Sequence, residues 1–128
     1  MKKLLLFLGG ALLIFVMIAA LFLLTGKPRS DAFLRAFELS EDGNTMTLHV
    51  GLSTSAGYLR KMEVKQGGEN KYITFYSTPG INSKIGAKDT FQLELQPVTA
   101  DIYFYSGDGS YRKVLEKNED TGMWYIVN

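Results

Sequence analysis

An unbroken run of uncharged residues, Leu4 to Leu24, stands near the N-terminus of this 128-residue chain and limits its possible architectures more than any other segment. At about 1.5 Å rise per residue, a helix of this length spans roughly the 30 Å hydrocarbon core of a bilayer. No ionisable residue lies between Lys3 and Lys27, and no two small residues stand four apart. The run therefore indicates a membrane anchor rather than an ion pathway or a pairing helix.

A cleavable signal peptide is the alternative interpretation of residues 1–26, because Lys2 and Lys3 give the chain a basic start. Signal peptides have an apolar region of only about 7 to 15 residues, followed by a small-residue cleavage site. Ile18 and Ala20 make a poor site of that kind. We favour an uncleaved anchor, with secretion after cleavage near Ala20 as the alternative. The short N-terminal tail favours a single-pass arrangement with the C-terminal domain outside the cytoplasm.

Beyond the anchor, the hydrophobic pattern changes to a period of two, which is typical of β-strands. From Met46 to Leu52, for example, apolar residues alternate with polar ones. Clusters of turn-forming residues at Glu41–Asn44, Gln66–Glu69 and Gly107–Ser110 separate such runs. The sequence therefore predicts several antiparallel hairpins.

About eight short strands at this spacing predict an all-β fold, a small antiparallel sandwich of immunoglobulin-like architecture. The sandwich is expected over residues 33–128, with a linker over 27–32. The paired cysteines of true immunoglobulin domains are missing, because the chain contains no cysteine. The resemblance to immunoglobulins is thus one of architecture alone.

Composition excludes several classes of function. Without cysteine there is no disulfide framework, no thiolate metal site and no cysteine nucleophile. Beyond Lys3 the chain carries 12 basic and 13 acidic residues, whereas nucleic-acid binders concentrate positive charge. We expect no nucleic-acid partner, no metal and no cofactor.

Candidate catalytic residues are few. His49 is the only histidine, and no nucleophile elbow such as Gly-x-Ser-x-Gly accompanies it. Three aspartates, Asp42, Asp108 and Asp120, fall in predicted turns, where backbone geometry alone favours them. A pair of hydrolytic carboxylates is defined by its separation in space, which the sequence does not give. No catalytic residue is assigned.

Aromatic residues carry the most suggestive pattern. Alternation places Tyr72 with Tyr76, and Tyr103 with Tyr105, on faces opposite buried apolar residues. Together with Trp124, these side chains are the candidate ligand-binding residues, because tyrosine and tryptophan combine apolar area with a polar group. Cross-strand packing that merely stabilises the sheet is the simpler interpretation.

The longest irregular segment, Thr78 to Lys88, has two interpretations of its own. It is either a crossover that closes one end of the core or a binding loop. The crossover is the more economical of the two.

Five segments of the domain bear on its relationships: Gly57–Met62, Thr74–Thr78, Lys84–Lys88, Ile102–Tyr105 and Gly107–Gly109. They resemble a set of uncharacterised small bacterial proteins with a membrane or signal segment. The resemblance covers most of the β domain and implies a bacterial envelope origin. It implies no activity.

Three functions remain open at this point. The first is a non-enzymatic envelope module that binds a protein or a wall polymer through the tyrosines. The second is a membrane-tethered hydrolase of cell-wall glycan or peptide. The third is an accessory subunit whose helix packs within a larger membrane complex. The lipid bilayer is the partner that all three share.

Overall fold

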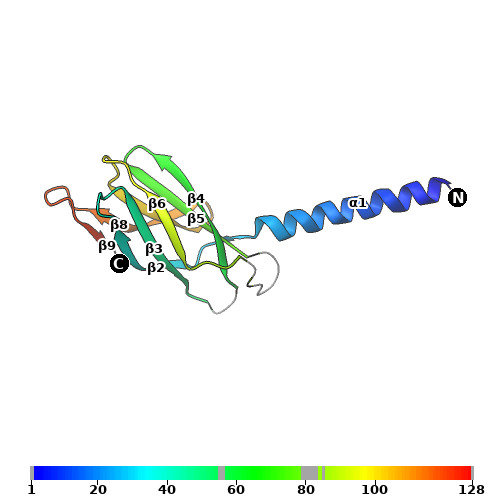
Figure 1. The fold of residues 1–128 in the computed structure, drawn as a ribbon, viewed down its shortest axis with the longest axis horizontal. Coiled ribbons are helices and arrows are strands. Elements are labelled where there is room, and N and C mark those ends of the chain that lie inside the picture. The colour runs from blue at the N-terminus through cyan, green and yellow to red at the C-terminus, as the bar shows by residue number, and fades with distance from the viewer. Residues whose placement is uncertain (1, 55–56, 79–83, 85, 128) are drawn as a thin grey trace.

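The computed structural model describes residues 2–54, 57–78, 84 and 86–127, and of residues 20–25 only the backbone. Within them the chain forms one helix and nine strands (Figure 1). These are α1 (Lys2–Thr25), β1 (Pro28–Arg29), β2 (Ala32–Leu39), β3 (Thr45–Leu52), β4 (Leu59–Gly67), β5 (Asn70–Ser77), β6 (Thr90–Glu94), β7 (Asp101–Gly107), β8 (Ser110–Lys117) and β9 (Trp124–Ile126).

The helix α1 contains the whole predicted span from Leu4 to Leu24 and projects away from the strands (Figure 1). Its segment Lys2–Ala19 has a mean hydropathy of 2.1 and is not buried against the domain. The helix is long and apolar enough to cross a membrane, a criterion that a signal sequence also meets. It ends before Gly26, whose φ of 62° is the left-handed conformation that favours glycine after a helix.

The strands form two sheets, so the predicted all-β domain behind an apolar helix is confirmed. Sheet A has six strands in the order β1-β5-β7-β8-β9, with β4 paired to β5. Sheet B has three strands in the order β2-β3-β6. The hairpins β2–β3, β4–β5 and β7–β8 turn within the three predicted clusters.

One pairing departs from the expected antiparallel arrangement. Strands β5 and β7 pair in parallel, with Tyr72 opposite Tyr103. The chain leaves sheet A after β5, crosses into sheet B as β6 and returns to sheet A as β7. Two crossings restore the original strand direction, which is why neighbouring strands of sheet A run the same way.

The segment expected as a linker, 27–32, contains a short strand of sheet A and the first residue of β2 in sheet B. Pro28 and Arg29 form β1 and pair with Tyr76 and Phe75 of β5. Proline suits the position because it cannot donate a ladder hydrogen bond and is confined to sheet edges. The folded domain therefore begins two residues after α1 ends.

The core lies between the two sheets, where alternate side chains of both meet. Sheet B contributes Met46, Leu48 and Val50, each no more than 2 % exposed. The ring of Phe75 on sheet A lies 5.1 Å from that of Phe91 on sheet B. One contiguous cluster thus holds the domain together: Ala32, Met46, Leu48, Val50, Leu59, Ile73, Phe75, Phe91, Leu93, Leu95, Ile102, Phe104, Val114 and Leu115.

Candidate binding face

The outer face of sheet A carries a cluster of tyrosines that starts at the parallel pair β5–β7. Because Ile73 and Phe104 point into the core, Tyr72 and Tyr103 point outward on adjacent strands. Their rings stack with centroids 5.0 Å apart and planes 20° from parallel. The parallel register brings these two predicted residues directly together.

A further tyrosine, Tyr111 on β8, joins the cluster and was not among the predicted site residues. Its ring lies edge-on to Tyr72 at 5.2 Å and to Tyr105 at 5.8 Å. A regular hairpin would place Tyr111 opposite Ser106, on the other face. The register shift between Tyr105 and Gly107 instead places it opposite Tyr105. The five residues Tyr72, Tyr76, Tyr103, Tyr105 and Tyr111 are called the tyrosine face below.

Tyr76 borders a small hollow of about 190 Å³ on this face. Tyr105 and Tyr111 line the same hollow, together with Glu63 and Thr74. Partial burial raises the pKa of the Tyr76 hydroxyl, and a hydrogen bond with the Glu63 carboxylate raises it further. The hollow therefore presents aromatic rings, hydroxyl groups, one carboxylate and the side chain of Lys65.

Lysines extend the face on both sides. The Nζ atom of Lys61 lies 5.3 Å from the ring centroid of Tyr76, and that of Lys113 lies 5.9 Å from that of Tyr103. Asp101 and Glu116 approach Lys113 Nζ at 3.6 and 3.7 Å. Partial burial disfavours the charge of Lys113, but these carboxylates outweigh it and raise its pKa. Cations over aromatic rings are worth about 0.5–1 kcal/mol at exposed sites.

Trp124, the fifth predicted binding residue, is not on the tyrosine face. It packs half-buried against the core cluster and pairs with Lys117 of β8. Its neighbour Tyr125 takes the outward position and donates a hydrogen bond to Glu116 at 2.6 Å. The outward aromatic residue of β9 is thus Tyr125.

Three larger hollows around the two sheets are lined by described residues. One of about 500 Å³ lies beside Arg35, Lys88 and Asp89. Another, of about 460 Å³, lies beside Phe33 and Arg112. Residues 79–83 and 85 of the proposed loop from Thr78 to Lys88 lie outside the described residues, so its role as crossover or binding loop stays a prediction.

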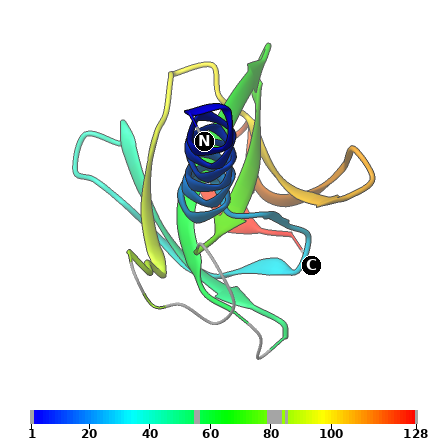
Figure 2. The same ribbon diagram turned by 90° about the vertical axis from the view of Figure 1, so that its right-hand side faces the viewer.

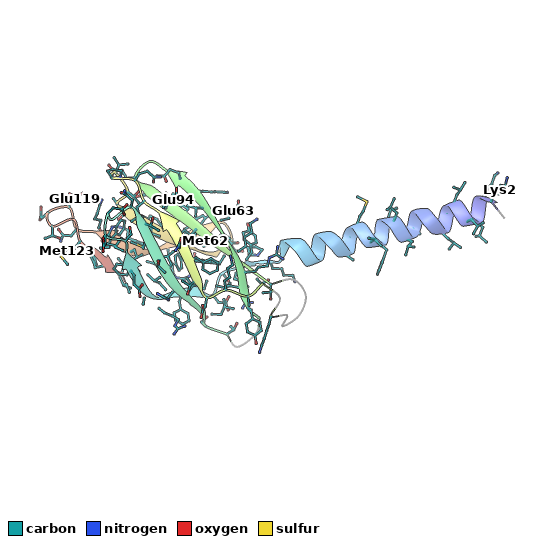
Figure 3. All side chains as sticks on the ribbon, in the orientation of Figure 1. Lys2, Met62, Glu63, Glu94, Glu119 and Met123 are labelled. Atoms are coloured by element: carbon teal, nitrogen blue, oxygen red, sulfur yellow. The ribbon has the colours of Figure 1, made fainter. Side chains whose placement is uncertain are left out.

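The third hollow, of about 560 Å³, lies between β4 and β6 and contains an unusual lysine. Met62 and Glu94, labelled in Figure 3, both line it. Lys71 also lines it and is only 5 % exposed. Burial lowers the pKa of Lys71, against the opposing attraction of Glu94. Partial burial of the Lys71 charge therefore lowers the free energy of unfolding of the domain.

The single histidine lies away from the tyrosine face, on the outer face of sheet B. His49 Nε2 is 3.5 Å from a carboxylate oxygen of Glu38, and Nδ1 is 3.5 Å from the hydroxyl of Thr90. Both contacts are at the limit of a hydrogen bond, and the Thr90 hydroxyl also donates to Asp89 Oδ1 at 3.2 Å. Among the described residues, no group of three His, Cys, Asp or Glu side chains could hold a metal ion.

Comparison of the chain with known proteins finds no matching family model, no matching curated protein and no matching solved structure.

Proposed function

We propose that this protein is a membrane-anchored, non-enzymatic module of the bacterial cell envelope that binds a protein or a wall polymer through the tyrosine face. The observation that carries the proposal is the gathering of five half-exposed tyrosines from three strands on one surface. Flat rings with hydroxyl groups stack on sugar rings and fill protein interfaces, where tyrosine is enriched. Lys61 and Lys113 add positive charge beside the rings.

The hollows favour binding over hydrolysis. A glycosidase needs two carboxylates within about 5 to 10 Å of each other across one cleft. Each of the four hollows described above is lined by at most one carboxylate among the described residues: Glu63, Asp89 or Glu94, and none in the fourth. A metal-dependent hydrolase lacks support, because no three possible metal ligands lie together among the described residues. Recognition without chemistry is therefore the better proposal.

The placement of the domain follows from the helix. We propose that α1 remains as the anchor and that the domain, a sandwich of immunoglobulin-like architecture, stands outside the cytoplasm. The length and hydropathy of α1 support the anchor, and the short N-terminal tail supports the orientation. In this arrangement the tyrosine face is exposed to wall polymers and to the outer parts of membrane proteins.

Two probes test the proposal with the full chain in mild detergent and in cells. The first is co-sedimentation with isolated peptidoglycan sacculi, and the second is photo-crosslinking in cells from a benzophenone residue at position 61, which is exposed beside Tyr76. In the double variant Tyr72→Ser with Tyr105→Ser, we expect both signals to fall by about tenfold or more, because truncating even one hot-spot tyrosine of an interface costs about 2 kcal/mol or more.

Phe33→Ser is the matched control, because Phe33 is an aromatic residue 41 % exposed on the outer face of sheet B. It should leave both signals unchanged. Circular dichroism of each variant confirms that the strands are retained. If the tyrosine variant and Phe33→Ser behave alike in both assays, the tyrosine face is not a binding surface.

A further inference from the structure

The end of the domain from which α1 leaves is distinguished by its charge. Strand β5 ends here at Ser77, which is opposite Leu59 at the start of β4. Strand β3 ends here at Leu52, which is opposite Ala32 at the start of β2. Figures 1 and 2 show α1 running outward from this end of the strands. We call it the helix end.

Basic residues concentrate at the helix end. Three acidic residues lie there, Asp31, Asp89 and Asp108. Eight basic residues lie in or next to the same strand ends and connections: Lys27, Arg29, Arg35, Arg60, Lys61, Lys84, Lys88 and Arg112.

The opposite end has the reverse charge. Its turns between β2 and β3, β4 and β5, and β8 and β9 carry no basic residue, and the adjoining strand ends carry three, Lys65, Lys71 and Lys117. The turns carry five acidic residues, Glu41, Asp42, Glu69, Glu119 and Asp120, and the same strand ends carry four more, Glu38, Glu94, Asp101 and Glu116. Glu119 is labelled in Figure 3, at the end of the domain away from the helix. The domain is therefore polarised along its strands although its net charge is close to zero.

A short and fixed connection holds the helix end close to α1. Only Gly26 and Lys27 separate α1 from β1, and two extended residues reach about 7 Å. The amide of Lys27 donates a hydrogen bond to Ser77 Oγ at 3.0 Å, and the amide of Ser77 donates one to the Lys27 carbonyl at 2.8 Å. Where α1 spans a bilayer, the helix end must lie within the headgroup layer, which is about 5 to 8 Å deep on each side.

Side chains at the helix end suit that layer. Lys27, Arg35, Lys84 and Lys88 are exposed to solvent. The Nζ atom of Lys84 lies 5.7 Å from the ring centroid of Tyr58, a half-buried tyrosine at the same end. Tyrosine beside lysine is the composition that anchors proteins at the membrane interface.

We propose that the helix end binds the anionic phospholipid headgroups of the membrane that α1 spans. The proposal rests on the anchor of the proposed function and adds a second contact with the bilayer. Each lysine or arginine near an anionic surface strengthens binding by about fivefold, within a Debye length of the headgroups. The acidic end is repelled by the same surface, so the domain stands with its strands pointing away from the membrane.

The test uses the absence of cysteine, since one introduced cysteine carries one label. The full chain with Ala87→Cys, at the helix end, or Thr121→Cys, at the opposite end, is labelled with a fluorophore. Each protein is reconstituted in vesicles of phosphatidylcholine alone or mixed with phosphatidylglycerol. Acrylamide, a neutral quencher, reports how accessible each label is to water. We expect phosphatidylglycerol to reduce quenching at position 87 by at least twofold and to leave position 121 unchanged.

Charge reversal identifies the residues responsible. Lys84→Glu with Lys88→Glu should abolish the effect of phosphatidylglycerol at position 87. The matched control, Lys113→Glu with Lys117→Glu, has the same change in net charge and should retain it. Equal quenching in both lipids, or equal effects of the two variants, would overturn the proposal. Flotation with vesicles of phosphatidylcholine alone tests the anchor separately, so failure of the anchor is recognised as such.

Discussion

Lys71 offers a sharp test of how the two sheets meet. Its side chain is 5 % exposed beside Met62, Val64 and Leu93, and no carboxylate of the described residues lies within ion-pair distance of it. Burying a polar group fully and without compensation costs about 1 to 3 kcal/mol, and the cost for Lys71 is at the lower end because its Nζ keeps contact with water. Since Glu94 offsets part of that cost, Lys71→Met should raise the free energy of unfolding at pH 7 by about 1 kcal/mol. For a domain of this size the melting temperature rises by about 4 to 8 °C.

The pH dependence of this effect has a definite sign. Burial lowers the pKa of Lys71, so the unfolded chain binds more protons than the folded one between the folded pKa and about 10.4. The stability of the wild type, as far as this group contributes, therefore rises with pH across that window. The advantage of Lys71→Met should shrink on going from pH 7 to pH 10.

Thermal unfolding of the full chain in mild detergent, followed by circular dichroism, measures both effects. Lys65→Met is the matched control, because Lys65 is exposed on the outer face of the same sheet. Its effect should stay within about 0.5 kcal/mol at either pH. A Lys71→Met protein that melts below the wild type at pH 7, or whose advantage grows toward pH 10, would refute the reasoning.

Three further predictions follow from other parts of the fold. Phe104→Ala should cost about 3 to 5 kcal/mol in chemical denaturation, because the ring is fully buried, and a loss below 1 kcal/mol would contradict the assigned core. Asp31→Asn should cost about 1 to 2 kcal/mol at pH 7, because it removes the negative charge and one of the two oxygens that accept hydrogen bonds from Arg29 at 2.8 and 2.9 Å. The Arg29 hydrogen bonds hold the pKa of Asp31 well below its usual range, so this contribution is present above about pH 4 and should vanish in acid titrations. Gly26→Ala should loosen the junction, because its Cβ would lie 2.0 Å from the carbonyl oxygen of Ser77, and faster exchange of the Ser77 amide with deuterium would detect it.

The sequence predicts those elements of the fold that depend on local patterns. Strand β3 was recognised because Met46, Leu48 and Val50 alternate with polar residues, and the structure buries all three. Strand β1 was not predicted, because two residues are too few to show an alternating pattern and its partner β5 lies some fifty positions away. The parallel pairing of β5 with β7 depends on the chain changing sheets twice, which no local pattern encodes.

In the candidate site, too, local patterns predict some residues, and others depend on how distant strands pair. Tyr72 and Tyr103 were predicted to point outward, and the structure confirms this for both. Tyr111 was missed because the bulge at Ser106 reverses its face. Trp124 was grouped with the tyrosines, whereas it packs against the core cluster. Alternation shows which residues of a strand share a face, but the pairing partner decides which face it is. The Asp108-Gly109 turn indicates the hairpin, but not the bulge beside it.

The central claim is that α1 holds the folded domain on the outer surface of the membrane. Proteolysis of intact spheroplasts that express the chain with a C-terminal epitope tag tests it most directly. We predict that added protease removes the tag without lysis, while an N-terminal fragment of the same chain stays in the membrane pellet. A tag that survives until the cells are lysed would contradict the orientation. A tagged chain found in the medium and beginning near Leu21 would contradict the anchor.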